Sequence, residues 1–149
     1  MNTSLKDTLE AIFHPRAIAV AGVSEAPSSF GYHFVRHLLD YGYPGYIYPV
    51  NPNRGSILGL KAYQSLSSVP GNFDYVICCL PASKVVDMLA ECPSKGVKAV
   101  HLLAAGLSET GREEAKELET EILRAARELG IRLIGPNCLG VYYPQGGMA

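Results

Sequence analysis

Ala17-Ile18-Ala19-Val20-Ala21-Gly22 is a run of five apolar residues that ends in a glycine, and it decides the fold class. A strand that is apolar on both faces must be covered from both sides, which is typical of a parallel sheet in an α/β protein. The polar loop after Gly22 leads to apolar residues at helical spacing over 30–39, and Gly42 follows as a helix stop. The chain therefore begins with a strand, a loop and a helix.

This alternation of apolar strands and amphipathic helices continues along the chain. Helices are expected over 85–92 and 110–129, and the second has Thr110 and Glu113 at the spacing of a capping box. Repeated βαβ units predict a Rossmann-like, doubly wound, mainly parallel sheet. We expect residues 1–149 to form a single domain, the first of a longer chain, because residues 146–149 provide no element that closes the fold. Further strands are expected over residues 46–50, 73–80, 97–105 and 131–134, with a short extended piece over 57–63.

The composition excludes several classes of protein. The chain has 149 residues, 48% of them hydrophobic, and 13 basic residues stand against 14 acidic ones. This balance argues against nucleic-acid binding, and no apolar run approaches the ~20 residues that span a bilayer. The four cysteines have neither the spacing of a zinc site nor that of a disulfide framework, so we expect a cytoplasmic protein.

The ends of the predicted strands are the first place to look for a ligand site. Right-handed crossovers place the carboxyl ends of parallel strands at one edge of the sheet, where open α/β sheets bind their ligands. The first such loop, Gly22–Gly31, is rich in glycine and serine and leads into a helix, whose N-terminal N–H groups suit a pyrophosphate. The dinucleotide fingerprint GxGxxG is missing, so a purely structural loop remains the alternative.

The second strand end discriminates between cofactors. NAD-binding domains place an acidic residue there to hold the ribose hydroxyl, whereas residues 51–54 read Asn-Pro-Asn-Arg. A guanidinium at this position is expected to bind a phosphorylated ribose, which both NADP and coenzyme A (CoA) carry. The alternative is that Arg54 is only a solvated turn residue. At the third strand end, Leu80, Pro81 and Ala82 are expected to line an adenine or a pantetheine arm.

The remaining candidates do not form a catalytic group. Cys138 lies in a glycine-bounded turn, but no histidine is placed to activate it. His33 and His37 are four residues apart on one predicted helix without a third metal ligand. His101 lies in an apolar strand, where a hydrogen-bonded core histidine is expected. The chain alone is therefore expected to bind a ligand rather than to catalyse a reaction.

These segments together resemble a known family. The chain is similar, from about Leu9 to Val141, to the N-terminal CoA-binding domain of NDP-forming acyl-CoA synthetases. These are the ADP-forming acetate–CoA ligases and relatives of the succinyl-CoA synthetase α subunit. The matching segments are 9–20 (LEAIFHPRAIAV), 31–32 (GY), 43–45 (YPG), 47–52 (IYPVNP), 57–63 (ILGLKAY), 103–109 (LAAGLSE) and 131–141 (IRLIGPNCLGV).

The resemblance implies a CoA site along the same edge of the sheet. Asn53 departs from the commoner family pattern, in which a lysine precedes the basic residue. The implied positions are Gly22 and Ser24 by the CoA diphosphate with Gly31 and Tyr32 next in the motif, Asn51, Pro52 and Arg54 around the phosphorylated ribose, Pro81 and Ala82 along the adenine or the arm, Ala105, Gly106 and Glu109 along the pantetheine, and Asn137 near the thiol.

The resemblance also implies a reaction that needs other domains. Family members interconvert acyl-CoA, NDP and phosphate with acid, CoA and NTP through a phosphohistidine. The expected partners are a histidine-bearing ligase domain and an ATP-grasp domain or subunit, and no segment of this sequence matches the histidine or its phosphate loops. The first alternative to a ligase module is a stand-alone CoA-binding regulatory protein. The second alternative is an NADP-binding reductase domain.

Overall fold

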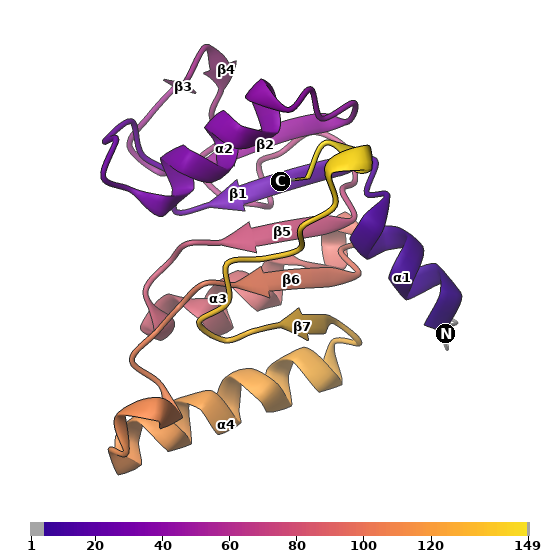
Figure 1. The fold of residues 1–149 in the computed structure, drawn as a ribbon. Helices are drawn as coiled ribbons and strands as arrows, with labels where there is room; N and C mark the ends of the chain where they lie inside the picture. Colours follow the sequence, from indigo (N-terminus) through magenta and orange to yellow (C-terminus); the bar gives the residue numbers. More distant parts are fainter. Residues whose placement is uncertain (1–4, 149) are drawn as a thin grey trace.

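A sheet of five parallel strands forms the centre of the computed structural model, which describes residues 5–148 (Figure 1). The strand order is β2-β1-β5-β6-β7, so the chain builds the sheet outward in both directions from β1. Ile18 in β1 lies opposite Ile47 in β2 and Tyr75 in β5. The bounds are β1 (Ala17–Ala21), β2 (Tyr46–Val50), β5 (Tyr75–Cys78), β6 (Ala99–Leu102) and β7 (Arg132–Ile134).

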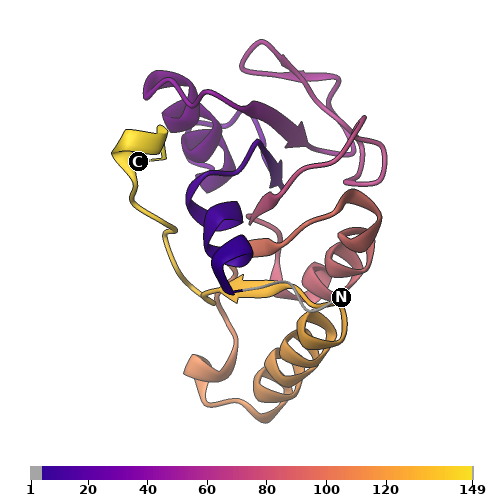
Figure 2. The same ribbon diagram turned by 90° about the vertical axis from the view of Figure 1, so that its right-hand side faces the viewer.

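Helices cover both faces of this sheet, as Figures 1 and 2 show. Ile18 and Val20 of β1 pack with residues of α1 and α2, whereas the alanines of the same strand pack with α3 and α4. The predicted doubly wound, Rossmann-like fold in a single domain is therefore confirmed. The helices are α1 (Leu5–Phe13), α2 (Phe30–Asp40), α3 (Val85–Glu91) and α4 (Glu113–Glu128), and a small hairpin joins β3 (Ser56–Ile57) to β4 (Leu60–Lys61).

The structure differs from the sequence-based expectations at three places. The strands β5, β6 and β7 are shorter than predicted, and α1 was not predicted at all. The capping box was wrong: α4 begins at Glu113, and its N-cap residue Arg112 makes no side-chain cap bond. The reason is that residues 108–110 form a separate 3-10 turn, after which Gly111 takes a φ of 74°. The Thr110 hydroxyl donates to the Leu107 carbonyl at 2.9 Å instead.

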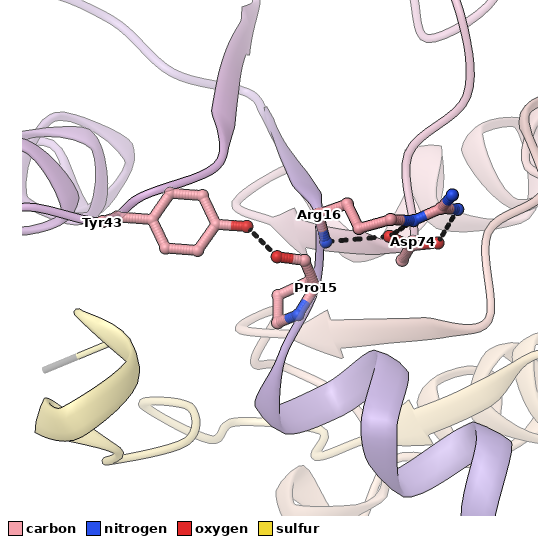
Figure 3. Close-up of polar contacts among 4 residues, drawn as sticks. All are labelled: Pro15, Arg16, Tyr43 and Asp74. Atoms are coloured by element: carbon pink, nitrogen blue, oxygen red, sulfur yellow. Dashed lines mark hydrogen bonds and ion pairs between the residues drawn. The ribbon is translucent and has the colours of Figure 1, made fainter.

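An ion pair between exposed Arg16 and buried Asp74 ties together the starts of β1 and β5 (Figure 3). Asp74 is only 8% exposed, and its Oδ2 accepts from the backbone N–H and the Nε of Arg16 at 2.9 and 3.0 Å. Its Oδ1 accepts from Nη2 of Arg16 at 2.7 Å. Burial alone would raise the pKa of Asp74, but the bonds and the charge of Arg16 hold it below its usual value. Beside this pair, the Tyr43 hydroxyl donates to the Pro15 carbonyl at 2.5 Å.

The expectation about His101 can be compared with the fold. His101 in β6 is 1% exposed, and its Nε2 donates to the Cys138 carbonyl at 2.5 Å, so the predicted hydrogen-bonded core histidine is confirmed. Among the described helices, none has the length and the apolar character needed to cross a bilayer.

Candidate functional site

The carboxyl ends of the strands gather at the edge of the sheet opposite to the Arg16–Asp74 pair (Figure 1). The chain leaves β1 toward β2 on one side, and β5 lies on the other, so β1 and β5 flank the point where the strand order reverses. Ligands of open α/β sheets bind at such a point. The predicted site residues follow the ends of β1 (Gly22, Ser24, and Gly31 and Tyr32 in the first turn of α2), β2 (Asn51, Pro52, Arg54), β5 (Pro81, Ala82), β6 (Ala105, Gly106, Glu109) and β7 (Asn137).

Gly22 brings the chain leaving β1 into contact with the end of β5. Its φ is 82°, and its N–H donates to the Val50 carbonyl at 3.1 Å. A Cβ on this residue would lie 2.9 Å from both the carbonyl carbon and the carbonyl oxygen of Cys79. Only glycine therefore fits here, which leaves the backbone uncovered at the reversal of strand order.

Gly31 has a comparable role where α2 begins. A Cβ there would lie 2.7 Å from the Cα of Val23, so the first turn of α2 packs directly onto the loop that follows β1. Ser29 caps this helix, because its Oγ accepts from the Tyr32 N–H at 3.4 Å. The close helix–loop packing that the third glycine of GxGxxG provides is thus present, at a different spacing.

Asn51 joins the loops after β1 and β2. Its Nδ2 donates to the Val23 carbonyl at 2.6 Å, and its Oδ1 accepts from the Asn53 N–H at 2.7 Å. Both the nitrogen and the oxygen of the Asn51 amide are bonded to backbone groups, so Asn51 holds the two loops in position. Arg54 lies next to the loop that follows β1. Its Nη1 is 3.9 Å from Oε2 of Glu25 in that loop, and 58% of the Arg54 side chain is exposed.

A first cavity of about 300 Å³ lies beyond the ends of β1, β2 and β5. Gly22, Pro52 and Leu80 form part of its wall, and Met88 of α3 contributes to an apolar floor. Lys84 and other polar side chains from 64–65 and from α3 also line it. An apolar cavity with a few polar groups is typical of a site for a small molecule or a cofactor.

A second cavity of about 290 Å³ lies beyond β5, β6 and β7. Phe30, Ala105, Asn137 and Leu139 line it, and Leu80 lines both cavities, so the two cavities are neighbours at Leu80. Among the described residues, those that line the second cavity carry no charged side chain. The two cavities adjoin along one edge and together provide an elongated site.

The loop after β7 is held in place by its own backbone and by the core of the sheet. Asn137 has a φ of 48° and donates its N–H to the Ala104 carbonyl at 3.1 Å. The next residue, Cys138, is bonded through its carbonyl to His101. Burial lowers the pKa of His101, so the ring is neutral at pH 7, with its proton on the Nε2 that donates to this carbonyl.

Glu109 stabilises the loop that follows β6. Its Oε1 accepts from the Gly106 N–H at 2.6 Å, and its Oε2 accepts from the Leu107 N–H at 3.0 Å. These backbone bonds lower the pKa of Glu109. Both oxygens of the Glu109 carboxylate are thus bonded to its own loop.

Pro81 begins the short turn that leads to α3, because its carbonyl accepts from the Lys84 N–H at 2.9 Å.

Only part of the predicted set lines the two cavities at this edge of the sheet. Gly22 and Pro52 line the first cavity, Ala105 and Asn137 line the second, and the other predicted site residues line neither. Leu80, expected together with Pro81 and Ala82, lines both cavities, whereas Lys84 and Phe30 were not predicted. Lys84 could have been identified from the sequence, since it is the one cation between the end of β5 and α3. Within residues 5–148, no group of three or more metal-ligating side chains is present.

The fold is a doubly wound α/β domain with two neighbouring cavities at the reversal of strand order. A family model described as the CoA binding domain matches residues 16–144. The chain belongs to this family, and the resemblance to the N-terminal region of ADP-forming acyl-CoA synthetases is confirmed.

Relatives with known names and structures extend this result. The chain is 41% identical over 140 residues to the α subunit of acetate–CoA ligase [ADP-forming] I of Pyrococcus furiosus. This match covers 91% of this chain and 30% of the subunit. A dinucleotide-forming acetyl-coenzyme A synthetase 1 of Ca. Korarchaeum cryptofilum, solved in complex with phosphate and ADP, has 38% identity and a TM-score of 0.88. That match covers 94% of this chain and 30% of the synthetase chain, so this chain spans less than a third of both relatives.

A second solved structure is closer in length to this chain. It is a Thermus thermophilus protein, described as cell-free ID.343, with 25% identity and a TM-score of 0.67. The match covers 92% of this chain and 94% of that chain. The same folding unit therefore also occurs as a chain of about this size.

Proposed function

We propose that this chain binds CoA along the carboxyl ends of its strands and serves as the CoA-binding module of an NDP-forming acid–CoA ligase. The observation that carries the proposal is the pair of adjoining cavities on either side of Leu80, in a chain of the CoA-binding family. CoA is a long molecule with a nucleotide at one end and an apolar arm at the other. A site in two parts suits this shape.

The nucleotide end of CoA fits the first cavity. The apolar floor, which includes Met88, provides a surface for the adenine, and the cavity is of a size typical for part of a small-molecule site. The diphosphate is then placed beside Gly22 and Ser24. There the uncovered backbone and the N-terminus of α2 favour an anion.

Arg54 is the residue that we assign to the 3′-phosphate of the CoA ribose. Its ion pair with Glu25 is long, at 3.9 Å, and both side chains are at least half exposed. Such pairs contribute little to stability. A phosphate therefore displaces Glu25 at low cost, and a bidentate guanidinium–phosphate contact replaces it.

The pantetheine arm fits the second cavity, which leads toward Asn137. The uncharged lining suits the arm, and Glu109 holds the loop beneath it. CoA supplies the thiol that accepts the acyl group. This chain positions the thiol, and the proposed partners are the histidine-bearing and ATP-grasp domains of the whole ligase. The unpaired state of all four cysteines supports a cytoplasmic location.

A stand-alone CoA-binding regulator is the second candidate. The observation that favours it is the Thermus thermophilus chain, which is matched over 94% of its length. The two candidates share the CoA site and differ only in the partners. Combining the chain with a histidine-bearing domain separates them, since only the module predicts acid–CoA ligase activity in the combined protein.

Arg54→Ala tests the assignment of the phosphate. We expect the variant to bind CoA about tenfold more weakly, a loss of ~1.4 kcal/mol, because a charge-assisted hydrogen bond is removed. Binding of 3′-dephospho-CoA, measured by calorimetric titration, is expected to stay unchanged. Arg36→Ala is the matched control, because Arg36 pairs with Asp40 on the exposed surface of α2. Equal weakening of both ligands by Arg54→Ala would remove Arg54 from this role.

A further inference from the structure

A third cavity, of about 430 Å³, lies at the opposite edge of the sheet from the proposed CoA site. It is formed where α4 ends and β7 begins, next to α1 (Figures 1 and 2). The side chains that matter for its chemistry are three cations, Lys98, Arg127 and Arg132, and three apolar residues, Leu123, Ala126 and Leu133.

The cations at this cavity lack the partners that the other arginines have. Within residues 5–148, neither the guanidinium groups of Arg127 and Arg132 nor the ammonium group of Lys98 has a hydrogen-bond or ion-pair partner. Lys98 contributes to the low pKa of Asp74, but that carboxylate is bonded to Arg16. The other five arginines each contact a side-chain oxygen, and their partners are Asp74, Asp40, Glu25, Thr110 and Glu128.

The fold stabilises a positive charge at the position of only one of the three cations. Arg127 lies in the last turn of α4, where a positive charge interacts favourably with the helix dipole. Lys98 and Arg132 come instead from the starts of β6 and β7, and strands have only small dipoles. Like charges around one cavity repel each other, so an anion bound among them would be favourable.

We propose that this cavity binds a small organic anion of nucleotide size, with phosphate groups on a partly apolar body. Arg127 and Arg132 supply planar guanidinium groups that match phosphate oxygens, and Lys98 adds a third positive charge. Leu123, Ala126 and Leu133 provide the surface for the apolar part. The site lies at the amino ends of the strands, so it is separate from the CoA site and does not depend on it.

Titration of the 149-residue chain with ADP and with pyrophosphate tests this proposal. We expect saturable binding of ADP, about tenfold weaker in the double variant Arg127→Glu/Arg132→Glu. The neutral variant Arg132→Gln is expected to show a smaller loss, and its milder change guards against misfolding. Arg124→Glu is the matched control, because Arg124 lies on the same helix but pairs with Glu128 and does not line the cavity. It is expected to bind ADP as the unchanged chain does.

Three outcomes would overturn the proposal. The first is that neither ADP nor pyrophosphate binds at millimolar concentration. The second is that ADP binds equally to the double variant and to the unchanged chain. The third is that CoA displaces ADP, which would place the ADP at the carboxyl ends of the strands. A double variant that loses ADP binding but keeps its CoA affinity would support the proposal.

Discussion

Gly22→Ala is expected to abolish measurable CoA binding and to lower the free energy of unfolding by about 3 kcal/mol. Two costs add up at this position. Alanine is strained at a φ of 82°, and its Cβ would lie 2.9 Å from backbone atoms of Cys79. To relieve the contact, the end of β1 must move away from the end of β5. That movement distorts the passage between the two cavities, where we place the diphosphate. Calorimetric titration and chemical denaturation measure the two effects.

Gly59→Ala is the matched control for this prediction. Gly59 has nearly the same conformation, with a φ of 79°, but a Cβ on this residue would meet no neighbouring atom within 4 Å. It lies in the β3–β4 hairpin, away from the cavities. We expect a loss of about 1 kcal/mol in stability and no change in CoA affinity. If Gly22→Ala bound CoA as well as Gly59→Ala does, the diphosphate could not lie at Gly22.

Asp74→Ala is expected to lower the free energy of unfolding by about 2–3 kcal/mol. The substitution removes the acceptor of three hydrogen bonds from Arg16, one of them from its backbone N–H. The loss stays moderate because the Arg16 side chain is 80% exposed and remains solvated without its partner. Asp40→Ala removes an ion pair between exposed side chains and is expected to cost about 0.3–0.5 kcal/mol. Equal effects of the two substitutions would contradict the role of Asp74.

The contribution of Asp74 should also depend on pH. Its pKa is lowered in the folded state, below the ordinary value of 3.8. The stabilisation is therefore complete above that ordinary value and is lost as the pH falls through the lower, folded-state pKa. We expect the stability difference between the unchanged chain and Asp74→Ala to be constant near neutrality and to shrink in acid. Denaturation at matched pH values measures it, and an unchanged difference in acid would exclude a charge effect.

The sheet and the loops at its carboxyl edge were predictable because buried parallel strands are nearly continuous apolar runs. The run at 17–21 and the glycine after it placed β1 and its exit correctly. The capping box failed because the local pattern of Thr110 and Glu113 does not reveal that Gly111 interrupts the helix. The helix α1 was not predicted, because it is only nine residues long and Ile12 is its one buried residue.

The candidate site was predictable only in part, for a related reason. Residues next to strand ends can be identified from the sequence, but the direction of each side chain depends on packing. Asn51 turns its amide toward Val23, and Glu109 turns its carboxylate onto its own loop. Lys84, in the turn just before α3, lines the first cavity together with Met88 of that helix. None of these orientations follows from spacing along the chain.

Calorimetric titration of the unchanged chain with CoA and, separately, with NADPH tests the central proposal most directly. Both ligands carry an adenine, a diphosphate and a phosphorylated ribose, but only CoA has the pantetheine arm that the second cavity is proposed to bind. We predict saturable heat with CoA at one molecule per chain and much weaker binding of NADPH. Saturable binding of NADPH without any heat from CoA would contradict the proposal and would favour a reductase domain.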